Sequence, residues 1–335
     1  MTELRVGLTL AGGGAKGVYQ VGVFKALDEL GLLNNITAIA GASIGAINAV
    51  MLTGSTQDRW QEMWNGLKYE QLLTHDLSDQ QEKVHIDISQ KLVEFAAEVK
   101  KRQLQIHTLR DLLDKREIAL FTQDGLIKLL TQYVDFEKVK QSRTKLWAAS
   151  YNMEKEEPEY FLLSNLEHED YLTVMKATTA LPIIFTPVEY KGSHYSDGIP
   201  PHVARQNADT IPVKPLYDSE CDLVIICYLR HNCTVDLSGF PESTHIIELY
   251  PSRSLEAIKG TGTFNISREV LAENQLLGYH DTLAAVAPYL LERQKGGSGE
   301  LAIAAHERYN AKLLDMQTSL LRRADELISK IKHNE

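Results

Sequence analysis

Cysteine is scarce in this chain of 335 residues, in which only Cys221, Cys227 and Cys233 occur. Zinc sites and redox sites built from cysteine usually show paired Cys-x-x-Cys spacing, which these three residues lack. We therefore expect three free thiols in a reducing compartment, and no metal site.

Long apolar runs are also absent. No uncharged run approaches the ~18 residues that a membrane-spanning helix needs. Residues 1–10 lack the order of charged, apolar and small residues that defines a signal peptide. We therefore expect no transmembrane segment and a cytoplasmic location.

Positive charge is in the minority, with 35 Lys and Arg against 45 Asp and Glu and a formal net charge of -10. This balance disfavours an electrostatic grip on nucleic acid or on anionic lipid headgroups. We expect no nucleic acid partner, and any lipid has to be held through apolar contacts. The hydrophobic residues, 44% of the chain, suffice for a sizeable globular core.

Two strand-turn-helix units are present near the N-terminus. The first consists of the β-prone run Arg5–Leu10, a glycine loop at residues 11–17, and a helical stretch with one apolar face. The apolar face comprises Val23, Phe24, Leu27 and Leu30. The second consists of the run Ile36–Ala40, the turn Gly41–Gly45 and an apolar helix through residues 46–52. Two such units predict an α/β fold with a parallel, doubly wound sheet.

The remaining chain allows a coarser outline. Residues 57–116 are polar and helical in character and form a candidate cap over a site. Short runs rich in Val, Ile and Tyr predict further strands near residues 145–150, 160–164, 223–228 and 245–249. We expect one main domain over residues 1–294, a glycine-rich linker at 295–299, and a C-terminal helix over 300–335 that serves packing or oligomerisation.

Ser43 is the first candidate for chemistry. It stands in Gly41-Ala42-Ser43-Ile44-Gly45, a Gly-x-Ser-x-Gly pattern between a predicted strand and a predicted helix. On such a sharp turn the glycines admit a strained backbone and the serine is exposed as a nucleophile, while the start of the helix favours negative charge. The alternative is a glycine-rich turn in which Ser43 only caps the helix.

The glycine loop is the second candidate. Consecutive glycines at Gly12, Gly13 and Gly14 can direct several backbone N–H groups to one point, as an oxyanion hole requires. The loop also fits the dinucleotide pattern G-x-G-x-x-G through Gly12, Gly14 and Gly17. However, the acidic residue that this pattern expects after the second strand is missing, and Lys16-Gly17 lacks the order of a P-loop. Nucleotide binding is therefore the weaker hypothesis.

A nucleophilic serine needs a base, and histidine is the usual one. Among the eleven histidines, His194 and His202 flank Asp197, but a histidine on a loop is more often a solvated surface group. Asp197, followed by Gly198, is the better candidate. An Asp-Gly step also has a plain reading as a turn.

Three ordered blocks make the chain similar to the patatin-like phospholipase family. Residues 12–17 resemble the family's Gly-Gly-Gly-x-Arg/Lys-Gly motif, and residues 41–45 resemble its Gly-x-Ser-x-Gly motif. Residues 177–187, with Asp197-Gly198 after them, resemble its Ala-Ser-x-Ala-x-Pro-x-x-Phe-x-Pro stretch and its catalytic Asp-Gly. Weaker matches extend the likeness over most of residues 5–283.

The resemblance implies a three-layer α/β/α sandwich with a central, mainly parallel sheet, and a catalytic domain over residues 1–294. It also implies that a Ser-Asp dyad hydrolyses acyl esters of glycerophospholipids or related lipids, with no metal and no cofactor. By position, Ser43 is the nucleophile and Asp197 the base. The amides of the oxyanion hole belong to Gly12, Gly13 and Gly14. The supporting motif positions are Lys16, Gly17, Gly41, Gly45 and Gly198.

Two departures from the family pattern leave the substrate open. Ile199 follows Asp197-Gly198 where the family commonly has Gly or Ala, and the stretch from there to residues 211–213 is longer than usual. A lipid substrate implies peripheral contact with a membrane. The alternative function is a catalytically weak lipid-binding or regulatory module on the same fold, which the presence of both Ser43 and Asp197 disfavours.

Overall fold

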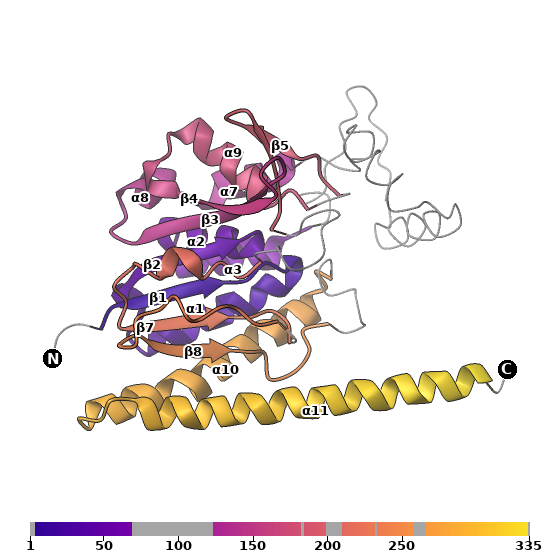
Figure 1. The fold of residues 1–335 in the computed structure, drawn as a ribbon. Helices are drawn as coiled ribbons and strands as arrows, with labels where there is room; N and C mark the ends of the chain where they lie inside the picture. The colour runs from indigo at the N-terminus through magenta and orange to yellow at the C-terminus, as the bar shows by residue number, and fades with distance from the viewer. Residues whose placement is uncertain are drawn as a thin grey trace.

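The structure, a computed structural model, describes residues 4–68, 123–181, 184–198, 210–231, 233–256 and 265–333. Within these ranges one eight-stranded sheet forms the centre and helices flank it (Figure 1). The strands are β1 (Val6–Leu10), β2 (Ile36–Ala42), β3 (Lys145–Asn152), β4 (Glu157–Leu162), β5 (Val188–Tyr190), β6 (Ser193–Ser196), β7 (Leu223–Cys227) and β8 (His245–Leu249). The α-helices are α1 (Val18–Glu29), α2 (Ile44–Gly54), α3 (Gln57–Gly66), α7 (Asp124–Tyr133), α8 (Phe136–Gln141), α9 (His168–Thr178), α10 (Arg268–Gln294) and α11 (Glu300–His333). The short 3₁₀ helices are η1 (Gly14–Gly17), η2 (Leu33–Asn35), η3 (Leu163–Asn165) and η5 (Lys214–Leu216).

The sheet is mixed but mainly parallel. Strands β3, β2, β1, β7 and β8 lie side by side in this order and are parallel. Strands β4 and β6 join β3 in the antiparallel sense, and β5 continues from β6. Both β1 and β7 are buried along their whole length, as strands covered on both faces are. The predicted α/β class with a mainly parallel central sheet is confirmed.

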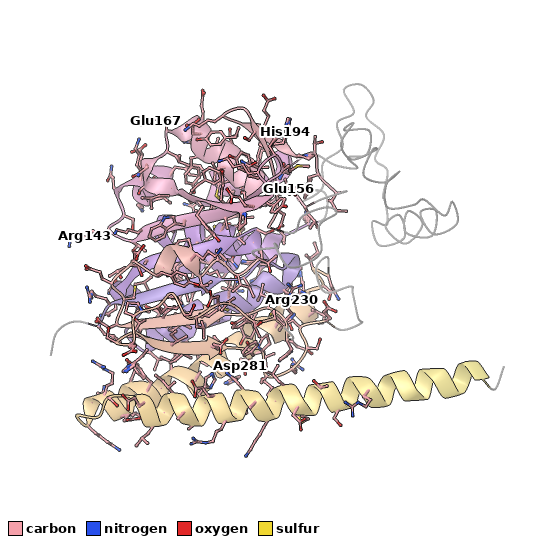
Figure 2. All side chains as sticks on the ribbon, in the orientation of Figure 1. Arg143, Glu156, Glu167, His194, Arg230 and Asp281 are labelled. Carbon is pink, nitrogen blue, oxygen red and sulfur yellow. The ribbon has the colours of Figure 1, made fainter. Side chains whose placement is uncertain are left out.

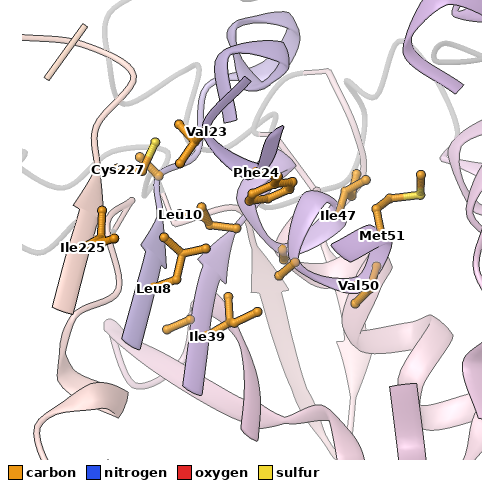
Figure 3. Packing of buried hydrophobic residues seen from close by; sticks show 14 of the residues in the cluster. Leu8, Leu10, Val23, Phe24, Ile39, Ile47, Val50, Met51, Ile225 and Cys227 are labelled. Atoms are coloured by element: carbon orange, nitrogen blue, oxygen red, sulfur yellow. The ribbon is translucent and has the colours of Figure 1, made fainter. Parts of the chain in front are cut away.

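Helix α1 packs on the sheet through the face that its sequence pattern selects. Val23, Phe24 and Leu27 are at most 1% exposed, and Leu30 packs partly buried against the same core. Figure 3 shows Val23 and Phe24 beside labelled residues of β1, α2 and β7. Burial of each large apolar side chain contributes about 1.5–3 kcal/mol. The predicted apolar face of this helix is confirmed.

The position of β6 decides where distant chain segments meet. Along β3, Ala149 pairs with β2, and Tyr151 pairs with β6. Strand β4 pairs with β3 from Trp147 to Asn152 and so occupies the opposite edge. Therefore β2 and β6 share one edge of β3. Because β6 is antiparallel to β3, the end of β6 is directed at the end of β2.

The C-terminal region consists of two long helices. Residues 295–299, for which we expect a linker, form the turn between α10 and α11, where the Gly299 amide donates to the Glu292 carboxylate at 3.1 Å. Helix α11 packs against α10 and runs along the edge strand β8 (Figure 1). The Asn310 side chain donates to the Glu248 carbonyl of β8 at 2.8 Å, which covers part of an open sheet edge.

Three expectations about the outer parts of the chain have different outcomes. Residues 57–66 of the candidate cap are helical, as α3, whereas residues 69–116 lie outside the described part of the chain. None of the described helices combines the length and the apolar character that a membrane span requires. Oligomerisation through the C-terminal helix stays a prediction.

The crossing of α1 and α10 depends on two glycines, and this leads to the first testable prediction. A Cβ atom at Gly22 would lie 1.9 Å from the Gln275 carbonyl oxygen, and one at Gly278 would lie 2.0 Å from the Tyr19 carbonyl oxygen. We expect Gly22→Ala to lower the free energy of unfolding by about 3 kcal/mol, because the helices have to separate. Urea denaturation measures the change.

The matched control is Gly66→Ala, at the end of α3, where a Cβ atom would meet nothing within 4 Å. This variant is expected to be as stable as the unmodified protein or slightly more stable, since alanine favours helix. Equal stability of the two variants would contradict the packing argument.

A second prediction concerns the ion pair that joins the starts of β1 and β7. The Arg5 amide donates to Asp222 Oδ2 at 2.8 Å, and the Arg5 guanidinium donates to Oδ1 at 3.2 Å. These hydrogen bonds hold the pKa of Asp222 below its usual value. A lowered pKa in the folded state adds stability above the usual pKa, and this stability is lost as the pH falls through the lowered value.

We therefore expect Asp222→Asn to be less stable than the unmodified protein near neutral pH. The difference narrows as the pH falls from about 5 to about 2. Urea unfolding midpoints at several pH values measure it. Glu220→Gln is the control, because Glu220 also pairs with Arg5 but its side chain is 84% exposed. A difference that does not change with pH would refute the assignment.

Candidate active site

Ser43 stands on a strained turn between β2 and α2. Its backbone has φ 53 and ψ -123, a conformation that is rare for a residue with a side chain. Glycine is required on both sides of Ser43 because a side chain there would clash with the backbone. A Cβ atom at Gly41 would lie 2.5 Å from the Ala46 amide nitrogen, and one at Gly45 would lie 2.1 Å from the Leu10 carbonyl oxygen. The geometry is that of a nucleophile elbow.

The Ser43 hydroxyl does not cap the helix. Ser43 occupies the N-cap position of α2, but its side chain makes no capping hydrogen bond. Its carbonyl oxygen accepts from the Ala46 amide at 3.0 Å, as in an ordinary first turn. The hydroxyl therefore lies at the positive end of a helix dipole without serving the helix, which speaks against the capping interpretation.

The glycine loop lies directly against this elbow. A Cβ atom at Gly12 would lie 3.3 Å from the Ser43 Cβ atom, and one at Gly17 would lie 2.4 Å from Cγ1 of Ile44. Gly14 has φ 59, in the left-handed region that favours glycine. The loop can follow this path only because side chains are missing at these positions.

The amides of the glycine loop are not equivalent. The Gly12 amide donates to the Thr210 carbonyl at 2.8 Å and is therefore already engaged. Gly13 is the N-cap of η1 and Gly14 is its first residue, and amides at the start of a helix have no partner within the helix. Of the three glycines that we assign to an oxyanion hole, Gly13 and Gly14 are thus the better donors.

Lys16 anchors the same loop through its side chain. The side chain is 8% exposed, and its Nζ atom lies 3.2 Å from Oε1 of Glu256. A Cβ atom at Gly13 would lie 3.3 Å from Cε of Lys16, so the lysine stem packs beneath the loop. A buried charge of this kind needs its partner. Glu256 has no motif around it, and the sequence offers no signal for this role.

Asp197 follows a strand that runs antiparallel to the strand before Ser43. It follows directly after β6, is 4% exposed, and donates its amide to the Ala180 carbonyl at 2.9 Å. Strand β2 ends opposite Ala149 and β6 ends opposite Tyr151, two positions further along β3. Two positions on a strand span roughly 7 Å. Ser43 and Asp197 are the next residues at these two ends, so the fold brings their backbones together.

Thr178 ties the elbow to the neighbouring strand. Its Oγ1 atom accepts from the Ser43 amide at 2.9 Å and donates to the Ala149 carbonyl at 2.5 Å. Thr178 is the last residue of α9, and Ala180, two residues later, holds the Asp197 amide. One short segment thus positions both candidate catalytic residues. The sequence places Thr178 within a motif, but it does not predict its hydrogen bonds to Ser43 and Ala149.

One of the two histidines near Asp197 lies within the described residues. His194 lies on β6 (Figure 2), and its Nδ1 atom is 2.7 Å from Oε1 of Glu154. Burial raises the pKa of Glu154, but hydrogen bonds from the side chain and backbone of His194 outweigh this and hold the pKa below its usual value. His194 is thus engaged with a carboxylate other than Asp197. His202 lies outside the described residues.

An apolar pocket borders the elbow. The residue after the serine, Ile44, lines it together with side chains of α2, α3 and α7, and the cavity measures about 20 Å³. The lining consists of Ile44, Ile47, Met63, Trp64, Leu67, Leu126, Leu129 and Leu130. The cavity has room for little more than a water molecule.

The fold and the elbow define an α/β protein with a serine on a strained turn between a parallel strand and a helix. Residues 8–210 match the family described as Patatin-like phospholipase, and the chain belongs to this family. The predicted family is confirmed. The match includes the glycine loop, Ser43 and Asp197.

Two curated relatives cover limited parts of the chain. It is 56% identical over 46 residues to lysophospholipase nte1 of Aspergillus terreus, which is 14% of this chain and 3% of that protein. It is 24% identical over 202 residues to the probable lipid hydrolase 463L of Invertebrate iridescent virus 6, which is 57% of this chain and 58% of that protein. The chain therefore spans less than two thirds of either relative.

Among solved structures, the chain is similar to VipD from Legionella pneumophila, with 16% identity and a TM-score of 0.48 over 84% of this chain and 66% of that chain. It is also similar to the ExoU-SpcU complex from the type III secretion system of Pseudomonas aeruginosa. There the identity is 16% and the TM-score 0.38, over 98% of this chain and 61% of that chain.

The third prediction tests the tie between α9 and the elbow. Thr178→Val keeps the shape of the side chain but leaves the Ser43 amide and the Ala149 carbonyl without their partner. We expect the free energy of unfolding to fall by about 1–3 kcal/mol, the cost of unpaired buried polar groups. Thr178→Ser retains the hydroxyl and is expected to lose only about 1 kcal/mol for the missing methyl group. Urea denaturation compares them, and a serine variant as unstable as the valine variant would contradict the assignment.

Proposed function

We propose that the protein hydrolyses acyl esters of lipids through an acyl intermediate on Ser43, with Asp197 as the general base. One observation carries the proposal: β2 and β6 end two positions apart on the same edge of β3, and Ser43 and Asp197 are the residues that follow. The strained backbone of Ser43 and the near-complete burial of Asp197 support it. Membership in the patatin-like phospholipase family agrees with this chemistry.

In the proposed reaction, Oγ of Ser43 attacks the ester carbonyl carbon while the Asp197 carboxylate accepts the hydroxyl proton. The negative charge that develops on the carbonyl oxygen is stabilised by the amides of Gly13 and Gly14 and by the start of α2. The tetrahedral intermediate then expels the alcohol, which takes up the proton from Asp197. A water molecule, deprotonated by Asp197, then attacks the carbonyl carbon of the acyl-serine. The bond to Oγ of Ser43 breaks, the fatty acid leaves, and Oγ takes the proton back from Asp197, which regenerates the free enzyme.

A lipid substrate fits the surroundings of the elbow. Ile44, the residue after Ser43, and seven further apolar side chains surround a cavity of about 20 Å³. This volume holds little more than a water molecule, so it is the apolar character of these side chains, and not the cavity itself, that suits a lipid. The net charge of -10 gives no general attraction for anionic headgroups, so contact with a membrane would be peripheral and apolar. The substrates we propose are acyl esters of glycerophospholipids or related lipids.

The fourth prediction tests the dyad with soluble p-nitrophenyl esters and mixed phospholipid vesicles. We expect Asp197→Asn to lower kcat by about 10²–10⁴-fold, the usual contribution of a general base. We expect Ser43→Ala to abolish both turnover and labelling by a fluorophosphonate probe, which reacts with activated serines. Release of p-nitrophenol and of free fatty acid measures the rates.

The matched control is His194→Gln, because His194 precedes Asp197 by three residues and pairs with Glu154. This variant is expected to keep the rate of the unmodified protein. If turnover survives Asp197→Asn but is lost in His194→Gln, the assignment of Asp197 is refuted and His194 becomes the candidate for the general base. A folded protein that releases no fatty acid and takes up no probe would favour the lipid-binding module.

A further inference from the structure

A buried polar network joins the helix that carries Ser43 to the glycine loop. The Asn48 side chain on α2 and the Gln20 side chain on α1 are both 0% exposed. Nδ2 of Asn48 donates to the Gly17 carbonyl at 2.8 Å and to Oε1 of Gln20 at 2.8 Å. Nε2 of Gln20 donates to the Ala11 carbonyl at 2.8 Å.

The hydrogen-bonding groups of Asn48 are all used. Both hydrogens of its amide are donated, and its Oδ1 atom accepts from the indole Nε1 of Trp64 at 3.3 Å. A buried polar side chain costs free energy unless it is hydrogen-bonded, and asparagine is not favoured inside a helix. A buried network in which the polar atoms are hydrogen-bonded, in contrast, fixes the elements that it joins in one arrangement.

The network grips the glycine loop at both ends. The Ala11 carbonyl lies at the start of the loop and the Gly17 carbonyl at its end, and the residues between them include three consecutive glycines. Glycine restricts the backbone least of all residues, so such a loop needs external contacts to hold its amides in place. Asn48 is five residues after Ser43 on the same rigid helix. Asn48 therefore fixes the position of the glycine loop relative to Ser43.

We propose that Asn48 and Gln20 are positioning residues that hold the amides of Gly13 and Gly14 at the distance from Ser43 that the transition state requires. This inference rests on the proposed function. A displacement of about 1 Å at a catalytic group can lower a rate by about 100-fold. Neither residue touches the substrate in this role, so their loss should affect kcat and leave substrate binding largely intact.

The test uses Asn48→Leu and Gln20→Leu with a soluble p-nitrophenyl ester. Leucine has a similar size but forms no hydrogen bond. For each variant we expect kcat to fall by about 10–100-fold, KM to stay within about threefold, and fluorophosphonate labelling to slow in parallel with kcat. Because Asn48 and Gln20 share a hydrogen bond, the double variant should lose little more than the worse single variant.

The matched control is Asn310→Leu. Asn310 is another buried asparagine that donates to a backbone carbonyl, that of Glu248, but it lies on α11 at the β8 edge. We expect this variant to lose stability while kcat remains that of the unmodified protein. Thermal unfolding of every variant shows whether the assay temperature lies within the folded range.

Three outcomes overturn the inference. Asn48→Leu that folds and keeps its kcat refutes it, and so does an equal loss of kcat in Asn48→Leu and Asn310→Leu, which marks a general effect of stability. If Asn48→Leu does not fold, Gln20→Leu decides alone, since it leaves α2 unchanged. An unmodified protein without turnover or labelling overturns the proposed function and this inference with it, whereas an active protein with unaffected variants overturns the inference only.

Discussion

The start of α2 and the end of β1 approach each other at a distance that no side chain could occupy, and the candidate site depends on this approach. Gly45 lies against the Leu10 carbonyl and Gly12 lies against Ser43, so the elbow and the glycine loop are in direct contact. With a Cβ atom at Gly45 the elbow and the glycine loop would separate. The amides of the loop would then no longer lie beside the serine.

Two further sets of contacts build on this approach from opposite sides. On one side, α9 ends in Thr178, which accepts from the Ser43 amide, and Ala180 holds the amide of Asp197. On the other side, Lys16 of the glycine loop pairs with Glu256, and Asn48 and Gln20 donate to carbonyls at the two ends of the loop. Side chains and backbone groups from separate segments of the chain therefore hold the candidate site in place.

Much of the fold was predictable because its signals are local. A β-prone run, a glycine turn and a helix with one apolar face follow one another twice, and the structure has both units where the pattern predicts them. Gly41 and Gly45 can be recognised from their spacing around Ser43, because the backbone of such an elbow has to be strained. The partners of the site were not predictable, since Thr210 and Glu256 lie far along the chain in segments without any motif.

By itself the sequence determined the α/β class, the family, the elbow and the glycine loop, because each of these is written in residues that are neighbours in the chain. Only the tertiary structure decided that β6 runs antiparallel to β3 and ends beside the end of β2, so that the backbones of Asp197 and Ser43 lie near each other, because strand order and direction depend on pairing between distant segments. It also decided that the Gly12 amide donates to the Thr210 carbonyl and that the Asn48 side chain donates to the Gly17 carbonyl of the glycine loop. Hydrogen bonds across such separations follow from packing, which no local pattern records.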